Sequence, residues 1–362
     1  DLSNLTLYTQ AKIEILQPVF TWGALKNAVK ASRAGAEASL NKFEITQNKT
    51  AFRLYKLYQS YLLSLEISFI LDEAQDKLEN VIAEFEKARK EEDSELSESD
   101  LFQLKVFQSE FGVRSGEVHV NADYIQQVWN FVLGDETADV VYMPDTYFLD
   151  PVENSIKSLT FYKERAVSER PEVLALNEGI QAAKYGLEAT KAKNLPALFV
   201  GFTGTYIHTP NPPLGSYAFK FDETNFAEAT LGIGFRQNLD FWGMKFDVDK
   251  SKIQLKKAKY SKQAATQGII LDLMEKYKDA SASKIEVEKL REAHTTAKRW
   301  LRQEQLDYDL GTVNTKDLID ALKKELMLRV QLKQAIYDFN VNMAELYKAS
   351  AIPVVKLKTD VD

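Results

Sequence analysis

The chain has no cysteine in its 362 residues, and it has few residues that interrupt regular structure, with 15 glycines and 9 prolines. The absence of cysteine excludes disulfides and thiolate metal sites. The scarcity of glycine and proline predicts long, uninterrupted elements rather than several small compact domains. A formal net charge of -7 provides no basic face to neutralise phosphates, which argues against a nucleic-acid partner.

Catalytic and metal-binding patterns are also missing. The three histidines, His119, His208 and His294, are far apart and have no carboxylate at ligand spacing, so we expect no metal site. No glycine-rich phosphate loop, nucleophile elbow or Cys/His pair is present. We therefore expect no enzymatic activity and no cofactor. The longest apolar run, around residues 61–71, is shorter than the roughly 18 residues that a membrane-spanning helix needs.

Two segments of the sequence occur twice. The segment Gln17–Gly23, which ends in Phe-Thr-Trp-Gly, returns about 220 residues later as Gln237–Gly243, which ends in Asp-Phe-Trp-Gly. Ser97–Leu101 returns in the same way as Asn314–Leu318. Each half reads as a strand, a long helix, a tight turn and a returning helix. We therefore divide the chain into a first repeat, residues 1–165, and a second repeat, residues 166–362.

Long helices are predicted at residues 22–89 and 242–310, which contain no proline. Each would extend about 100 Å at 1.5 Å per residue, a length typical of coiled coils. Apolar residues step by three and four in Leu71, Ala74, Leu78, Val81, Phe85 and Ala88, and again in Leu332, Ile336, Phe339, Met343 and Leu346. Charge on both flanks favours helices with neighbours on two sides in a curved wall. A simple helical bundle or coiled-coil rod is the alternative.

The turns between the helices carry capping signals. Ser97 precedes Asp100 by three positions, and Asn314 precedes Asp317 by three, so each pair resembles an N-cap with an acidic N3 partner. Gly311 suits the left-handed position that ends a helix. Both halves therefore predict helical hairpins.

Strands are predicted at residues 4–15, 197–207 and 226–239. The first alternates apolar and polar residues, and its length suits a tilted strand that crosses a bilayer. Aromatic residues stand near the strand ends, among them Trp22, Phe241 and Trp242, which we interpret as membrane-interface residues. A small antiparallel sheet with an aromatic core is the alternative. With long hairpins attached, we favour a barrel closed by oligomerisation, because closure removes the exposed sheet edges.

The sequence resembles the TolC family of outer-membrane efflux and secretion channels over nearly its whole length. The resemblance rests on Glu169–Leu176, on Asn194-Leu195-Pro196, on Tyr308–Gly311 and on Asp317–Asp320. It implies a mainly α fold with β, in which antiparallel hairpins form a coiled-coil α-barrel and membrane strands form a β-barrel. The two tandem repeats are completed by homotrimerisation, with four strands from each protomer.

The resemblance also implies the function and the partners. It describes a passive exit duct of a tripartite efflux pump or type I secretion system, in the outer membrane with a long periplasmic extension. The partners implied are a periplasmic adaptor protein, an inner-membrane transporter and outer-membrane lipid. The competing interpretation is a coiled-coil scaffold or adhesin with a small β-sheet.

Several site residues follow from the resemblance. Asp317 and Asp320 match acidic rings at the narrow periplasmic entrance, and their spacing of three puts both on one helix face. Tyr308 and Asp100 match residues that link neighbouring hairpins and keep the entrance closed. The tip that contacts the adaptor comprises Leu310, Gly311, Thr312 and Val313. Val313 departs from the family pattern, because an arginine often makes a further closing ion pair there.

The first repeat lacks the helix and strand that precede the corresponding point of the second repeat. Three strands per protomer would give a trimeric barrel only nine strands. We therefore expect the natural protein to continue upstream of Asp1.

Overall fold

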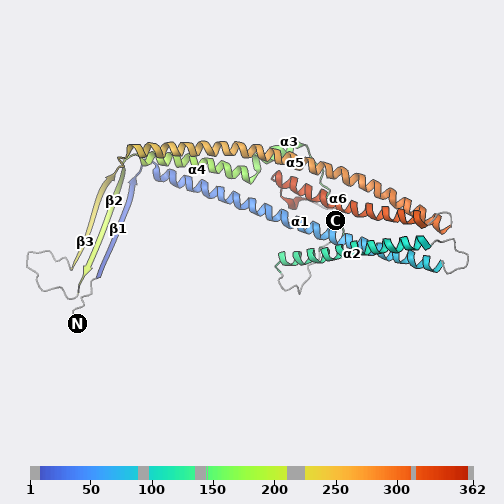
Figure 1. Ribbon diagram of the computed structural model, residues 1–362. Helices are drawn as coiled ribbons and strands as arrows, with labels where there is room; N and C mark the ends of the chain where they lie inside the picture. Colours follow the sequence, from blue (N-terminus) through green and yellow to red (C-terminus); the bar gives the residue numbers. More distant parts are fainter. Residues whose placement is uncertain are drawn as a thin grey trace, which may run out of the picture. The chain divides into compact units, whose positions relative to one another are not determined.

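The computed structural model describes residues 9–88, 98–134, 144, 146–209, 225–310 and 315–357 (Figure 1). Its elements in chain order are β1 (Thr9–Phe20), α1 (Ala24–Ala88), α2 (Glu98–Val132), α3 (Leu159–Glu169), α4 (Pro171–Lys193), β2 (Ala197–His208), β3 (Phe226–Arg236), α5 (Phe241–Asp309), α6 (Thr315–Ala349) and the 3-10 turn η2 (Val354–Lys356). The chain forms two compact units. Unit 1 contains residues 1–42 and 174–265, and unit 2 contains residues 43–173 and 266–362.

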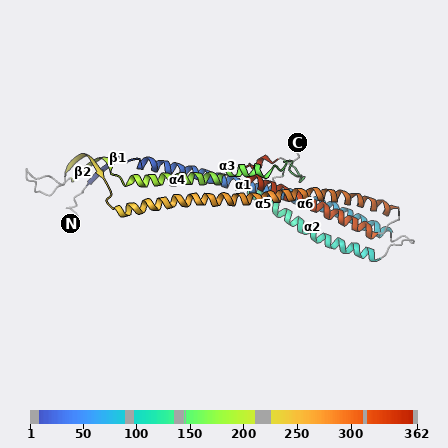
Figure 2. The same cartoon turned by 90° about the horizontal axis from the view of Figure 1, so that it is seen from above.

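The long helices confirm the expectation from low proline content. α1 has 65 residues and α5 has 69, and each is followed by a returning helix of 35 residues, α2 or α6. α5 and α6 lie side by side in both views (Figures 1 and 2). Residues 89–97 and 311–314 are not among the described residues, so the predicted caps Ser97 and Asn314 and the predicted turn residue Gly311 stay predictions.

Unit 1 contains an antiparallel sheet with the order β1-β2-β3. β1 pairs with β2 from Thr9↔His208 onward, and β2 pairs with β3 from Ala197↔Arg236 to Ile207↔Phe226. The first strand continues to Phe20, five residues beyond the predicted end at Ile15. The register of its pairing with β2 shifts between Pro18 and Phe20. Proline is tolerated there because β1 is an edge strand of the described sheet, on which a missing N–H need not remove a hydrogen bond between strands. The third strand ends at Arg236, before the predicted Leu239.

Unit 2 has a core in which the predicted helical seams are buried. Leu71, Ala74 and Leu78 of α1 pack with Leu104 and Phe111 of α2. The predicted seam of α6 lies in a second cluster, together with residues of α3 and α5; its members are Leu332, Ile336, Phe339, Met343 and Leu346. The apolar steps of three and four thus predicted the buried faces correctly. The predicted seam residues Phe85 and Ala88 have side chains outside the described part of the chain.

A buried carboxylate of α1 and a partly buried lysine of α6 hold the segment that follows residue 148. The Glu66 carboxylate forms an ion pair with Lys333 Nζ (2.5 Å) and accepts a hydrogen bond from the backbone N–H of Leu149 (2.6 Å). Lys333 Nζ also donates to the carbonyl oxygen of Leu149 (3.2 Å). The buried carboxylate of Glu66 therefore has a charged partner, as a buried charge requires.

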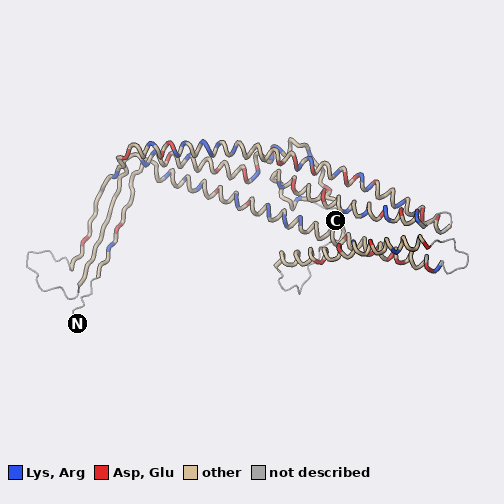
Figure 3. Tube along the Cα trace, in the orientation of Figure 1, with Lys and Arg blue, Asp and Glu red and all other residues tan. Residues whose placement is uncertain are grey.

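Charged residues are spaced along the helices and are few on the strands (Figure 3). Among the residues that the structure describes, no helix is both long enough and apolar enough to cross a membrane.

Candidate functional site

The sheet has one apolar face. The rung formed by Ile15, Phe202 and Leu231 runs across all three strands, because Ile15 pairs with Phe202 and Phe202 pairs with Leu231. Farther along β3 on the same face, Ile233 is 77% exposed and Phe235 is 79% exposed. In a single chain this apolar face is open to solvent. Such a face is suited to contact with lipid.

The opposite face of the sheet is polar. The neighbouring rung consists of Glu14, Thr203 and Thr230. Lys12 Nζ forms an ion pair with Glu14 (3.3 Å), and the Thr230 hydroxyl donates to Glu228 Oε1 (3.2 Å). Alternation of an apolar and a polar face is the pattern of barrel strands that separate lipid from an aqueous interior.

The pair Trp22-Gly23 forms the joint between β1 and α1. Trp22 has φ 53° and Gly23 has φ 85°, so both residues adopt left-handed backbone conformations just before α1. The Trp22 indole N–H donates to the carbonyl oxygen of Pro196 (2.8 Å), and its ring meets Phe20 edge-on at 4.9 Å. The joint therefore connects the end of β1 to the residue that precedes β2.

The second Trp-Gly pair has a different local structure. α5 already begins at Phe241, so Trp242 and Gly243 lie in its first turn. Asp240 is the N-cap, since its Oδ1 accepts from the Gly243 N–H (2.9 Å) and its carbonyl accepts from the Met244 N–H (2.9 Å). Trp22, Phe241 and Trp242 are all more than half exposed, as an interface role would require.

The rotation of α6 at the tip determines where its acidic residues lie. Leu318 is buried with Leu301 of α5, and Ile319 is buried in the cluster between α1 and α2. Asp317 and Asp320 are left on the exposed side of α6, three positions apart. They therefore share one accessible face, as predicted. Asp317 also stands in the first turn of α6, where a carboxylate interacts favourably with the helix dipole.

The other predicted tip residues are only partly described. Tyr308 is half-buried and packs against a cluster that contains Leu318 of its own hairpin. The side chain of Asp100 and residues Gly311, Thr312 and Val313 lie outside the described residues, so a link between Tyr308 and Asp100 stays a prediction. Leu310 is 76% exposed at the end of α5.

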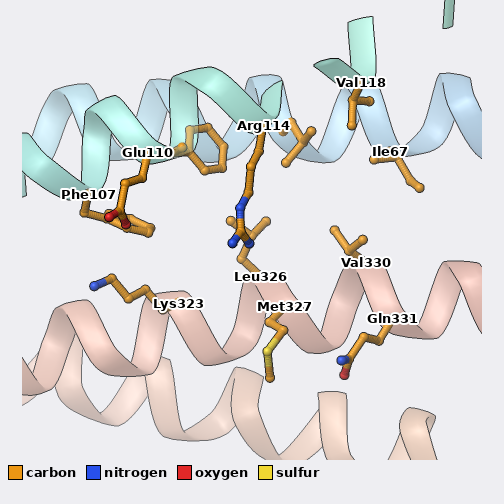
Figure 4. Close-up of a pocket in the computed structure, with 12 residues that line it drawn as sticks. Ile67, Phe107, Glu110, Arg114, Val118, Lys323, Leu326, Met327, Val330 and Gln331 are labelled. Carbon is orange, nitrogen blue, oxygen red and sulfur yellow. The ribbon is translucent and has the colours of Figure 1, made fainter. Parts of the chain in front are cut away.

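A cavity that the sequence did not indicate lies between α1 and α2 on one side and α6 on the other (Figure 4). It has a volume of about 450 Å³ and is mainly apolar, with lining residues that include Ile67, Leu71, Leu326 and Val330. Lys323 Nζ lies 4.3 Å from the centroid of the Phe107 ring, and Arg114 extends from α2 toward α6. Its walls come from helices more than 200 residues apart, so no local sequence pattern could reveal it.

The segment Glu169–Leu176 contains a second feature that sequence reasoning identified only as a motif. The Arg170 guanidinium donates to both carboxylate oxygens of Glu172 (3.1 and 3.2 Å) and to Asp272 of α5 (3.4 Å). Burial of Glu172 opposes its ionisation, but the hydrogen bonds and charge of Arg170 outweigh burial and hold the pKa of Glu172 below its usual value. Arg170 thus connects the junction of α3 and α4 to α5 through its hydrogen bonds.

α5 and α6 are joined at the same level by Lys276, which pairs with Glu345 at 2.6 Å. The hydrogen bond from that carboxylate raises the pKa of Lys276. Among the described residues, no group of three or more acidic, histidine or cysteine side chains is arranged to hold a metal ion.

α2 carries a second apolar stripe that faces away from its own core. The exposed members are Phe102, Val106, Val113, Val120, Tyr124 and Phe131. Their separations of four and seven residues keep them within one narrow strip of the helix surface. The buried residues Leu104 and Phe111 lie on the other side of α2. The helix therefore has apolar surface on two sides, as the curved-wall interpretation requires.

Similarity to known proteins agrees with this architecture. Residues 163–351 match the sequence profile of a family described as outer membrane efflux protein. No curated protein matches the chain by sequence.

Solved outer-membrane proteins share the fold over almost the whole chain. The open-state MtrE channel of Neisseria gonorrhoeae has 14% identity and a TM-score of 0.73, covering 98% of this chain and 82% of its own. VceC of Vibrio cholerae has 12% identity and a TM-score of 0.71, with 98% and 88% covered. CmeC of Campylobacter jejuni has 14% identity and a TM-score of 0.68, with 100% and 80% covered.

Proposed function

The chain belongs to the outer membrane efflux protein family, and from this membership we propose that it forms, as a homotrimer, the exit duct through which a tripartite assembly expels its cargo. It is an outer-membrane efflux channel with a periplasmic helical extension, and a transport protein rather than an enzyme. The observation that carries the proposal is the sheet with one apolar and one polar face, from which helices of 65 and 69 residues continue.

Association of three copies is supported by unpaired surfaces. In the part of the chain that the structure describes, β1 and β3 are the edges of the sheet, and an open edge in a bilayer leaves backbone groups without hydrogen-bond partners. The exposed stripe of α2 supplies a heptad surface for the helix of a neighbouring copy. Closure into a ring would bury both kinds of surface at once.

The duplication supports the same design. β1, α1 and α2 have 12, 65 and 35 residues, and β3, α5 and α6 have 11, 69 and 35. We propose that residues 1–165 and 166–362 are two tandem repeats, each of which contributes one hairpin to the tunnel wall. In this arrangement Trp22, Phe241 and Trp242 lie at the membrane interface, where aromatic side chains are favoured.

We propose that the tip of the second hairpin forms the periplasmic entrance. Asp317 and Asp320 share an exposed face, so three copies would bring six carboxylates to one constriction and attract cations. Tyr308 and Asp100 would link neighbouring hairpins in the closed state.

The proposed partners are a periplasmic adaptor and an inner-membrane transporter that supplies the energy. We propose that the adaptor contacts Leu310, Gly311, Thr312 and Val313. The exposure of Leu310 supports this assignment. The apolar cavity lined by α1, α2 and α6 offers a surface of the kind that an amphipathic helix contacts.

Reconstitution of the purified full chain in planar bilayers tests the proposal. We expect discrete conductance steps, cation selectivity, and a requirement for detergent or lipid to keep the trimer in solution. A chain that stayed monomeric and dispersed without detergent and gave no conductance would contradict the channel and favour a coiled-coil scaffold or adhesin.

A further inference from the structure

A second cavity lies in unit 1, where the sheet meets the helices. It has a volume of about 350 Å³ and is bounded by the ends of the strands, the start of α1 and the end of α4. Its lining is predominantly apolar and includes Pro18, Ala24, Ala28, Leu195, Ala197 and Phe199.

The register of the sheet shows which face this cavity opens on. Pro18 pairs with Phe199, and Ala197 pairs with Arg236, so these four residues lie on the same side of the sheet. Phe199 is four positions from Thr203 along β2, so this side is the polar face that contains Glu14, Thr203 and Thr230. In a channel, the polar face lines the aqueous interior. The cavity therefore opens toward the transport path rather than toward lipid.

Two cations, Arg236 and Lys193, line this apolar cavity. Arg236 lies over the Phe199 ring, 5.3 Å from its centroid, and Lys193 is in the last turn of α4. Neither forms an ion pair with a carboxylate within the described part of the chain, and no Asp or Glu of that part lines the cavity. Elsewhere on the polar face, by contrast, Lys12 is paired with Glu14.

We propose that this cavity is a binding site for amphipathic organic anions on the wall of the channel. The apolar lining would receive the hydrophobic body of the solute, and Arg236 and Lys193 would receive its negatively charged group through charge-assisted hydrogen bonds. The inference rests on the proposed channel function and deepens it, because it names a class of cargo that binds at the junction of the strands and the helices.

Block of the reconstituted channel by naphthalene-2-sulfonate tests the proposal. Naphthalene-2-methanol serves as the neutral probe of the same shape, and sodium sulfate serves as the anion without an apolar body. We expect the sulfonate to block current at the lowest concentration of the three. Arg236→Gln and Lys193→Gln should each raise its half-blocking concentration about ten-fold, the effect of losing a hydrogen bond to a charged group.

Two further variants separate this site from general attraction. Ala28→Phe keeps both cations and fills the cavity, so it should weaken block by the sulfonate as strongly as a charge substitution. Lys12→Gln removes a cation from the same face away from the cavity and should leave block unchanged.

Several results would overturn the site while leaving the channel intact. One is normal conductance with equal block by the sulfonate in all variants. Another is a change in block by Lys12→Gln as large as that by Arg236→Gln. A third is block by sulfate at the same concentration as by the sulfonate. Absence of any conductance in the unsubstituted chain would instead overturn the channel function, and this site with it.

Discussion

The Asn340 side chain accepts a hydrogen bond through Oδ1 from the backbone N–H of Val152, 188 residues away in sequence, at a distance of 2.9 Å. Its Nδ2 donates to Gln59 Oε1 and to the carbonyl oxygen of Asp150, each at 2.9 Å. Asn340 is completely buried. One amide thus holds α1, α6 and the segment before α3 together.

Replacement of this amide should destabilise unit 2. Asn340→Leu leaves the Val152 N–H and the Gln59 amide without their partner, and each orphaned buried group costs roughly 1–3 kcal/mol. We expect the free energy of unfolding to fall by about 3 kcal/mol, measured by denaturant titration with circular dichroism in detergent. Asn41→Leu is the matched control, because Asn41 is only partly buried and its side chain donates to the carbonyl oxygen of Glu37 within its own helix. Equal losses of unfolding free energy in both variants would contradict this role of Asn340.

A side chain at Gly243 should destabilise the protein as long as Asp240 caps α5. A Cβ built at Gly243 would lie 2.2 Å from Asp240 Oδ2, so Gly243→Ala should displace the cap and cost about 1 kcal/mol of stability. In an Asp240→Ala background the same substitution should cost almost nothing. Thermal unfolding of the unsubstituted protein, the two single variants and the double variant measures the coupling between Gly243 and Asp240. Additive losses of stability would show that the clash is relieved in another way.

The acidic pair at the tip should control cation selectivity. Replacement of both Asp317 and Asp320 with alanine removes six carboxylates from the proposed trimeric entrance, so cation selectivity and block by multivalent cations should both decrease. Reversal potentials in asymmetric salt measure the change. Asp123→Ala, an exposed carboxylate on α2, is the control. Unchanged selectivity in the double variant would mean that the pair does not line the pore.

The exposed stripe of α2 should be required for assembly. Val113→Lys combined with Val120→Lys introduces two charges per protomer into the proposed helix–helix contact, so the trimer should dissociate in detergent at concentrations where the unsubstituted chain stays assembled. Light scattering coupled to size-exclusion chromatography measures the mass. Asn121→Lys adds a charge to α2 outside the stripe and should leave the trimer intact. A stable trimer in the double variant would exclude this stripe as the contact.

The junction of α3 and α4 should weaken in acid. Because the folded-state pKa of Glu172 is held below its usual value of 4.5, the carboxylate stabilises the fold at neutral pH, and this contribution is lost as the pH falls through the lowered pKa. We expect the melting temperature to drop below about pH 4.5. The drop should be smaller in Glu172→Gln than in Glu188→Gln, which removes a surface carboxylate paired with Lys191. Identical acid profiles would refute the role of Glu172.

Much of the fold could be predicted because its signals are local. The absence of proline predicted the long helices, and apolar residues spaced by three and four predicted the buried seam from Leu332 to Leu346. Strict alternation of apolar and polar residues predicted the two faces of β1. The end of β1 was wrong by five residues. Proline usually ends a strand, and only pairing with β2 shows that the chain continues past Pro18.

The candidate site could be predicted only where it lies on one element. The spacing of Asp317 and Asp320 placed them on a common face of α6. The Arg170 junction joins residues 102 positions apart, Arg170 and Asp272, and the network of Asn340 joins residues 281 positions apart, Asn340 and Gln59. Each cavity is likewise lined by segments that are distant in the sequence. Such contacts have no period that a sequence window can detect.

The sequence by itself determined the repeated order of strand, long helix and returning helix, because these depend on periodicity and on the lack of helix-breaking residues. Only the tertiary structure decided the local structure of each Trp-Gly pair. Trp22 and Gly23 form a left-handed joint that bonds to Pro196, whereas Trp242 and Gly243 lie inside the first turn of α5. The physical reason is the environment of each pair: Pro196 supplies a hydrogen-bond acceptor for the first, and Asp240 supplies an N-cap for the second.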